Sequence, residues 1–255
     1  MSALAPIQAV EAFHRVFLRA FEARVDRSLY VVKGGVNLRA WFGSLRYSED
    51  LDVDVLRGEP FELGEKVDAV LAGPALRDML RAQRLAITRT SKPKQTATTQ
   101  RWKFELAVAN RTQPLNTKIE FSRRGTAEDY TLEPMLAEIV RPYGIATPTA
   151  NHYTAAAATR QKIGALAGRR ETQARDIWDL EHLFRACQAD PRPLPASSQK
   201  ALEVAIERVM DMQFETYKAQ VVSFLAAEHQ ELHGNRDAWQ RIQELVGERL
   251  MALQP

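Results

Sequence analysis

The pattern of apolar positions along the first half of the chain predicts alternating helices and strands. Residues 5–25 carry apolar side chains at helical spacing, and residues 36–42 predict a second, shorter helix. The segment EKVDAVLAGPALRDMLRAQ predicts one or two further helices with a break at Gly73-Pro74. Short β-rich or alternating segments predict strands: SLYVV, residues 51–56, LAITRT, TTQRWKFELAVA and LNTKIEFS. This order predicts an α/β or α+β fold with a mixed sheet.

After about residue 130 the strand signals disappear and helical periodicity takes over. Six segments predict helices: EPMLAEIV, HYTAAAATRQKIGALAG, ARDIWDLEHLFRACQ, SSQKALEVAIERVM, TYKAQVVSFLAAEH and DAWQRIQELVGERLM. Pro142 and Pro148 bracket a predicted linker. We therefore expect a small mixed-sheet domain over residues 1–145 and an all-helical domain over residues 146–255, in two lobes with a cleft between them.

Composition places the chain among globular proteins of a reducing compartment. The hydrophobic fraction is 45% and the charged fraction 26%, which is ordinary for a globular domain. A single cysteine, Cys187, excludes an internal disulfide framework. No apolar run approaches the length of a membrane span, and the start lacks a basic region before its apolar part. We expect a cytoplasmic protein with no membrane partner.

Basic residues are concentrated in one part of the chain. The net charge is only +3, yet residues 77–124 hold twelve lysines and arginines against three acids. A segment of this kind can hold a polyanion by neutralising its phosphates. The alternatives are a phosphate or RNA contact and a solvated strand face with a mobile loop.

Three aspartates alternate along EDLDVDV, at the start of the predicted strand 51–56 and within it. Because side chains alternate between the faces of a strand, Asp50, Asp52 and Asp54 share one face, and the apolar residues between them share the other. Carboxylates this close repel each other unless a cation joins them, and Mg²⁺ prefers oxygen ligands. Glu120 in NTKIEFS is a candidate third ligand. The alternative for the Asp-x-Asp pattern alone is an exposed edge strand with a polar face.

A glycine pair precedes these carboxylates. Gly34-Gly35 follows a predicted strand and precedes a predicted short helix. Glycine permits close backbone approach, and amides at a helix start can bind phosphate. The alternative is a simple tight turn, but the order of strand, Gly-Gly, helix and acidic strand is more specific than any of its parts.

Together these motifs resemble the AbiEii/AbiGii nucleotidyltransferase toxin family, which belongs to the polymerase-β-like nucleotidyltransferases. The first motif is Gly-Gly followed by Arg46-x-Ser48-x-Asp50-Leu51-Asp52, and the second is Lys118-Ile119-Glu120. Lys162 matches the lysine of the third motif. The helix motif (K/R)D-x-x-D-L is matched by Arg175-Asp176-Ile177-Trp178-Asp179-Leu180. The resemblance covers roughly residues 30–185, in the family's order.

The resemblance implies a role for each motif residue. Asp50, Asp52 and Glu120 would hold Mg²⁺ or Mn²⁺, although Asp52 and Asp54 fit the same pattern two residues later. Lys162, Asp176 and Asp179 would complete the catalytic set from the helical side, with either aspartate facing the cleft. The residues expected near the NTP phosphates are Lys33, Gly34, Gly35, Arg46, Ser48 and Lys162.

The implied function is nucleotide transfer from an NTP to an acceptor, with the 3′ end of a tRNA as the acceptor that the relatives suggest. The protein would act as the toxin of a toxin–antitoxin or abortive-infection (phage defence) pair, with a cognate antitoxin encoded nearby. Two alternatives remain open: a small-molecule nucleotidyltransferase of the antibiotic-modifying type, and a non-catalytic module that binds RNA or an antitoxin.

Overall fold

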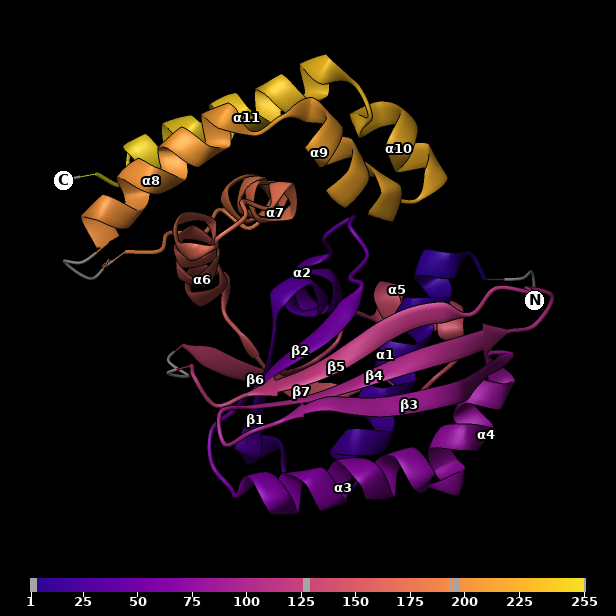
Figure 1. The fold of residues 1–255 in the computed structure, drawn as a ribbon. Helices are drawn as coiled ribbons and strands as arrows, with labels where there is room; N and C mark the ends of the chain where they lie inside the picture. The colour runs from indigo at the N-terminus through magenta and orange to yellow at the C-terminus, as the bar shows by residue number, and fades with distance from the viewer. Residues whose placement is uncertain (1–3, 126–128, 193, 195–197, 255) are drawn as a thin grey trace. The chain divides into compact units, whose positions relative to one another are not determined.

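The structure is a computed structural model that describes residues 4–125, 129–192, 194 and 198–254. By its internal contacts the chain divides into two compact units. The sheet unit comprises the chain up to Gly43 together with Tyr47–Tyr153. The helical unit comprises Ser44–Arg46 and the chain from Thr154 onward. Figure 1 labels the elements of both units.

The sheet unit is built on a seven-stranded mixed sheet of order β3-β4-β5-β2-β1-β7-β6. Strand β2 is antiparallel to β1 and parallel to β5, and β1 is parallel to β7. The mixed sheet predicted from the sequence is therefore confirmed. Its strands are β1 (Tyr30–Lys33), β2 (Asp50–Val55), β3 (Leu85–Gln95), β4 (Thr99–Val108), β5 (Leu115–Ser122), β6 (Tyr130–Pro134) and β7 (Thr149–Tyr153).

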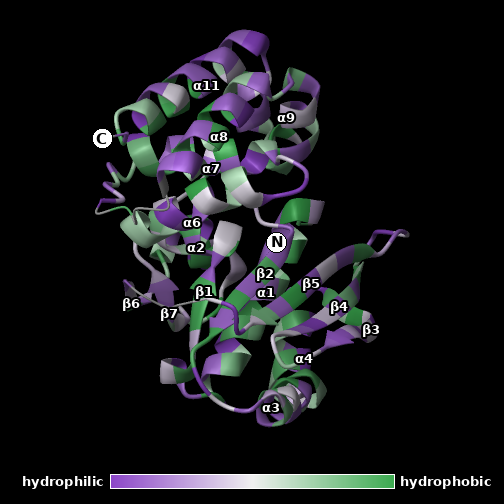
Figure 2. Ribbon diagram, turned by 60° about the vertical axis from the view of Figure 1, so that its left-hand side comes forward, coloured by the Kyte–Doolittle hydropathy of each residue, from purple (hydrophilic) through white to green (hydrophobic). Residues whose placement is uncertain are grey.

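Helices α1, α3 and α4 pack against one face of this sheet. Their apolar side chains form one core with those of the strands, including Phe13, Phe17 and Trp102. The predicted break at Gly73-Pro74 separates α3 from α4, because proline suits the first turn of a new helix. The helices of this unit are α1 (Pro6–Glu22), α2 (Gly34–Phe42), α3 (Pro60–Ala72), α4 (Pro74–Ala82) and α5 (Ala137–Val140). Figure 2 shows hydrophobic and hydrophilic residues alternating along these elements.

The prediction that strands end near residue 130 is wrong. Strands β6 and β7 extend the sheet unit to Tyr153, past the predicted boundary at residue 145, and only the short α5 forms within EPMLAEIV. Strand β7 reads TANHY, so it lacks an apolar alternation. Its polar residues are nevertheless buried: Asn151 donates to the backbone oxygen of Arg27, and His152 stacks on Trp41 with 4.5 Å between ring centroids.

The helical unit forms a second apolar core around α7, α8 and α11. The segment TYKAQVVSFLAAEH, expected as one helix, forms α9, a short 3₁₀ turn and α10 instead. The helices are α6 (Ala155–Gly168), α7 (Ala174–Arg185), α8 (Ser198–Asp211), α9 (Phe214–Gln220), α10 (Ala227–His233) and α11 (Arg236–Met251). No helix in the described residues of either unit is long and apolar enough to span a membrane.

Candidate active site

The predicted carboxylates share one face of the sheet, which we call the carboxylate face. In the pairing of β2 with β5, Asp50 lies beside Lys118 and Asp52 lies beside Glu120. The apolar residues Leu51 and Val53 point to the opposite face and are buried under the helices. The alternation read from the sequence therefore places Asp50, Asp52 and Glu120 on neighbouring strands of one surface.

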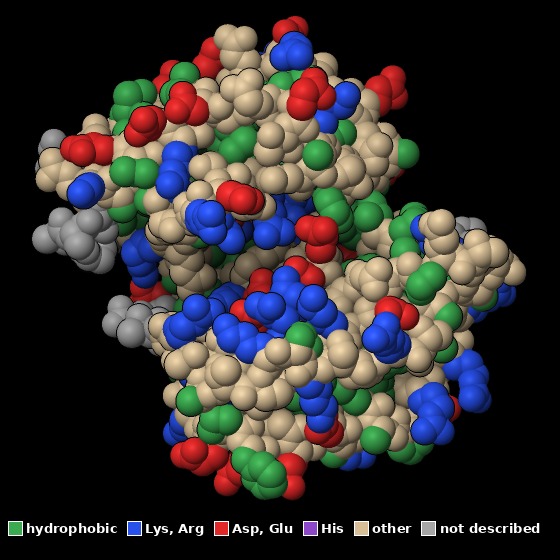
Figure 3. Space-filling view, viewed as in Figure 1, with side chains coloured by type: hydrophobic (Ala, Val, Ile, Leu, Met, Phe, Trp, Pro, Cys, Tyr) green, Lys and Arg blue, Asp and Glu red, His purple; other side chains and the backbone are tan. Residues whose placement is uncertain are grey.

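Two of these three carboxylates are held by cations of the same face. Lys118 donates to Oδ2 of Asp50, and Nη2 of Arg101 lies 2.5 Å from Oε2 of Glu120. Figure 3 shows lysine and arginine side chains gathered around acidic ones on the surface of the sheet unit.

Asp52 differs from both neighbours, because no hydrogen bond or ion pair within the described residues reaches its carboxylate. Burial raises its pKa, and the negative charges of Asp50 and Glu120 act in the same direction, against the opposing charges of Lys118 and Lys33. An unpartnered carboxylate between two others is suited to receive a cation.

The carboxylate of Asp54, in contrast to that of Asp52, already has partners within the fold. Its side chain is almost fully buried, Nζ of Lys33 lies 2.5 Å from Oδ1, and the hydroxyl of Tyr153 donates to Oδ2 at 2.8 Å. Both carboxylate oxygens are therefore engaged within the fold. This geometry favours Asp50 and Asp52, rather than Asp52 and Asp54, as the ion-holding pair.

The glycine pair forms the first turn of α2. Gly34 has a positive φ of +68°, a conformation that glycine adopts at little energetic cost. A Cβ atom at this position would lie 3.3 Å from Oδ2 of Asp52, so the backbone passes close to the carboxylate. The residue before the helix, Lys33, provides no side-chain cap, which leaves the first-turn amides without a side-chain acceptor.

Polar contacts of buried and half-buried side chains support the start of β2. The hydroxyl of Ser48 donates to the backbone oxygen of Asp50 at 2.8 Å. The hydroxyl of Thr117 donates to the backbone oxygen of Glu49 and is itself hydrogen-bonded to Nε2 of His14 at 2.8 Å. Burial, followed by the positive charges of Arg15 and Lys118, lowers the pKa of His14 to about 3. This histidine is therefore neutral and acts as a hydrogen-bond donor to the strand region.

In the helical unit, Lys162, Asp176 and Asp179 meet in one buried cluster. Both aspartates are 0% exposed. Nζ of Lys162 lies 2.9 Å from Oδ1 of Asp176 and 2.6 Å from Oδ2 of Asp179. Arg169 lies 2.7 Å from the second oxygen of Asp176. Nη2 of Arg46 contacts both oxygens of Asp179, at 3.1 and 3.0 Å.

The charges of this cluster keep both aspartates ionised. Burial alone would raise the pKa of Asp179, but the charges of Arg46 and Lys162 outweigh burial and lower it. Lys162 and Arg169 do the same for Asp176. Burial alone would lower the pKa of Lys162, and the two aspartates reverse that effect and raise it. The aspartates thus fix the position and the positive charge of Lys162. Arg46 in turn contacts Asp179 and stabilises its negative charge.

Oxygen donors on the carboxylate face match the chemistry that Mg²⁺ and Mn²⁺ prefer. Asp52 supplies a carboxylate with no partner among the described residues, and Asp50 and Glu120 supply two more beside it in the strand register. Within the described part of the chain, no three acidic, histidine or cysteine side chains form a ready-made metal site. The donor set therefore fits a divalent ion, provided that Asp50 and Glu120 exchange their present ion pairs.

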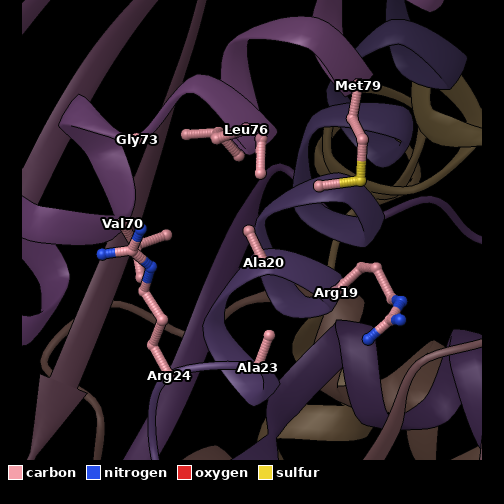
Figure 4. Close-up of a pocket in the computed structure, with 9 residues that line it drawn as sticks. Arg19, Ala20, Ala23, Arg24, Val70, Gly73, Leu76 and Met79 are labelled. Carbon is pink, nitrogen blue, oxygen red and sulfur yellow. The ribbon is translucent and has the colours of Figure 1, made fainter.

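A separate depression lies among α1, α3 and α4, on the helix-covered side of the sheet unit. It is lined by Ala20, Val70, Leu76 and Met79 with the arginines Arg19 and Arg24 nearby (Figure 4). Its lining includes no carboxylate, histidine or cysteine, so it offers neither an acid–base pair nor metal ligands.

Three residues that complete these arrangements, Arg101, Tyr153 and Arg169, were not predicted from the sequence. Arg101 pairs with Glu120 only through the register of β4 and β5, which no sequence pattern specifies. Tyr153 lies on the strand that was not predicted. Arg169 follows α6 directly, and helical periodicity gave no sign that it reaches Asp176.

Comparisons with known proteins identify a family and a fold for the chain. A family model described as the nucleotidyl transferase AbiEii toxin of a type IV toxin–antitoxin system matches residues 16–252. No curated protein sequence matches the chain. Among solved structures, JHP933 from Helicobacter pylori is 17% identical and covers 98% of this chain and 96% of its own, with a TM-score of 0.60. MenT4, a nucleotidyltransferase toxin from Mycobacterium tuberculosis, is 16% identical, with coverage of 98% and 94% and a TM-score of 0.55. At these identities the structural likeness shows the fold.

Proposed function

The chain belongs to the AbiEii family of nucleotidyltransferase toxins, and from that premise we propose that it transfers a nucleotide from an NTP to the 3′ end of an RNA in a reaction that depends on Mg²⁺ or Mn²⁺. We propose tRNA as the acceptor class, a cognate antitoxin encoded nearby as a partner, and the cytoplasm as the location. The observation that carries the proposal is the unpartnered carboxylate of Asp52, set between Asp50 and Glu120 on one face of the sheet.

Asp50, Asp52 and Glu120 would hold the metal. When bound, divalent ions stabilise the attacking and leaving oxygens of the phosphoryl group. Asp50 and Glu120 would then release Lys118 and Arg101, the two cations that neutralise them in this structure. The released cations would remain beside the carboxylates, where they can bind phosphate oxygens.

The start of α2 would hold the phosphates of the NTP. The first-turn amides at Gly34 and Gly35 have no side-chain cap, and the N-terminal end of a helix favours negative charge. We place Lys33 and Ser48 near the same phosphates. Lys33 directly precedes α2 and would add its positive charge while it remains paired with Asp54, and the hydroxyl of Ser48 holds the backbone oxygen of Asp50.

Within the helical unit, Lys162 would supply a fixed positive charge suited to binding phosphate. The distances around Lys162 support a role for Asp176 and Asp179 in positioning this lysine rather than in binding metal, because cations already contact their oxygens. Arg46, which was expected near the NTP, would act through Asp179 in the same way.

The proposal is tested with purified protein, labelled NTPs, Mg²⁺ and total tRNA. We expect label from at least one NTP to appear at tRNA 3′ ends, and Asp52→Asn to abolish it. The matched control is Asp78→Asn, which removes the same charge from α4. The side chain of Asp78 is 69% exposed and is not part of the proposed site. Absence of labelling with all four NTPs, or full activity of Asp52→Asn, contradicts the proposal.

The toxin role is tested in cells. Expression of the wild-type chain should arrest growth, Asp52→Asn should not, and co-expression of the neighbouring antitoxin gene should restore growth. Sequencing of tRNA 3′ ends from arrested cells should show added nucleotides. Equal arrest by Asp52→Asn would instead support a non-catalytic binding module.

A further inference from the structure

Basic side chains of β3, β4 and β5 share the carboxylate face. In the pairing of β4 with β5, Arg101 lies beside Glu120 and Lys103 lies beside Lys118. In the pairing of β3 with β4, Lys94 lies beside Arg101 and Arg89 beside Glu105. Because paired residues of adjacent strands share a face, five cations are set against two carboxylates on these three strands.

Two of these cations lack a compensating charge. Arg89, Arg101 and Lys118 each have a carboxylate partner. No carboxylate within the described residues pairs with Lys94 or Lys103. Lys103 is exposed and Lys94 is half-buried. We call Lys94 and Lys103 the basic pair.

The surplus positive charge belongs to this face and not to the hairpin as a whole. Lys92, two residues before Lys94, lies at the irregularity of β3 between Ser91 and Lys94. Its ammonium group pairs with Asp68 of α3, on the helix-covered side. The same Asp68 accepts a hydrogen bond from the core residue Trp102. Lys92 and Lys94 therefore lie on opposite faces of the sheet.

The basic pair lies on β3 and β4, further across the sheet than the predicted metal site on β2 and β5. The sheet order places β5 next to β2, β4 beyond β5, and β3 beyond β4. At roughly 5 Å per strand, Lys103 and Lys94 lie about 10–15 Å across the sheet from β2. That is the reach of a few nucleotides of a single strand.

We propose that the basic pair binds the phosphodiester backbone of the RNA acceptor, so that the strand crosses β3, β4 and β5 with its 3′ end toward Asp50 and Asp52. This inference rests on the proposed function and adds the path of the acceptor. The charges differ along this path. An RNA strand would contact lysines without carboxylate partners on β3 and β4, and then reach the carboxylates on β2 that are proposed to bind metal.

The test compares the Lys94→Ala/Lys103→Ala double variant with Lys92→Ala. The control loses a lysine from the same strand but from the opposite face. A labelled single-stranded RNA of about 12 nucleotides is the probe, and its Kd is measured by anisotropy at several salt concentrations, without NTP or metal. Binding of a fluorescent NTP with Mg²⁺ is measured in parallel, and thermal melts check that each variant folds.

We expect the double variant to weaken RNA binding and to reduce the slope of log K against log salt by about 1.4, at roughly 0.7 per single-strand phosphate contact. Lys92→Ala should leave both quantities unchanged, and NTP binding should match wild type in all variants. The proposal is overturned if the double variant binds RNA like wild type, if Lys92→Ala weakens binding equally, or if NTP binding falls instead, which would make the basic pair a triphosphate subsite.

These measurements test the proposed RNA-binding surface independently of the proposed nucleotide transfer. Loss of RNA affinity in the double variant supports the surface even if no NTP labels any RNA, in which case only the proposed reaction fails. Nucleotide transfer with unaltered RNA binding in the double variant supports the reaction and overturns the surface.

Discussion

The buried cluster of the helical unit gives a sharp prediction for Asp179→Ala. Both oxygens of this carboxylate contact Nη2 of Arg46, at 3.1 and 3.0 Å, and one lies 2.6 Å from Nζ of Lys162. The substitution removes the carboxylate that Arg46 contacts and one of the two carboxylates that hold Lys162, at a site where Asp179 is 0% exposed. Breaking a buried ion pair from one side costs about 3–5 kcal/mol, far more than the loss of a few methylene contacts.

The assay must resolve the two units, because a chain of two units need not unfold in one step. Hydrogen exchange followed by mass spectrometry reports on α6 and α7 separately from the sheet. A loss of 3–5 kcal/mol predicts exchange in these helices at least about 100-fold faster, since every 1.4 kcal/mol is tenfold. Peptides from β4 and β5 should exchange at the wild-type rate.

The control is Glu215→Ala, which removes an acid from the same unit. Its partner Arg236 lies 3.5 Å away, and the two side chains are 71% and 75% exposed. An exposed pair contributes about 0–1 kcal/mol, so this variant should resemble wild type. If Asp179→Ala leaves the exchange of α6 and α7 unchanged, the aspartate does not stabilise the cluster, and its assignment to positioning Lys162 is wrong.

Three further outcomes follow from the sheet unit. Because the pKa of His14 is lowered in the folded protein, the unfolded chain takes up a proton at this residue below about pH 6.5 and the folded chain does not. Lowering the pH from 7 to 5 should therefore reduce the free energy of unfolding, measured with urea, by about 2 kcal/mol. His14→Gln should remove this part of the pH dependence, and an unchanged pH dependence in the variant contradicts the prediction. Asp52→Asn should raise the stability of the metal-free protein by roughly 0.5–2 kcal/mol, because it relieves repulsion in a site kept for function, and a lower melting temperature opposes this interpretation. Tyr153→Phe removes the hydroxyl that donates to buried Asp54 and should destabilise the sheet unit by about 1–3 kcal/mol in the same unfolding assay, whereas an effect near zero means that the hydrogen bond contributes little.

Much of the sheet unit could be predicted because its elements follow simple periods. The alternation in DLDVDV correctly separated the acidic face from the core face, and Gly73-Pro74 correctly marked the break between α3 and α4. Strand β7 could not be predicted, because its polar residues are buried through partners elsewhere in the chain. Asn151 depends on a backbone oxygen near β1, and His152 depends on the aromatic ring of Trp41.

Residue types at the site could be predicted, but their present partners could not. The sequence indicated Asp50, Asp52 and Glu120 as candidates, yet pairing with Lys118 and Arg101 depends on strand register. Register is fixed by the whole sheet, since a shift of one residue moves every side chain to the other face. A short pattern within one strand does not contain that information.

The two acidic motifs of this chain show why spacing alone does not assign a role. Asp50 and Asp52 are two residues apart on a strand, and Asp176 and Asp179 are three residues apart on a helix, so each pair shares a face. The helical pair is neutralised by Lys162, Arg169 and Arg46, which together contact all four of its oxygens. A metal ion would have to displace those cations from a site with no exposed aspartate surface.

The strand pair lacks such neutralisation. Lys118 donates a hydrogen bond to Asp50, and no hydrogen bond or ion pair among the described residues reaches the carboxylate of Asp52. The unbalanced negative charge favours binding of a further cation, whereas the balanced cluster favours a rigid, permanently charged Lys162. The difference in neutralisation, rather than the number of acids or their spacing, is therefore the physical reason to propose metal binding by Asp50 and Asp52 and a positioning role for Asp176 and Asp179.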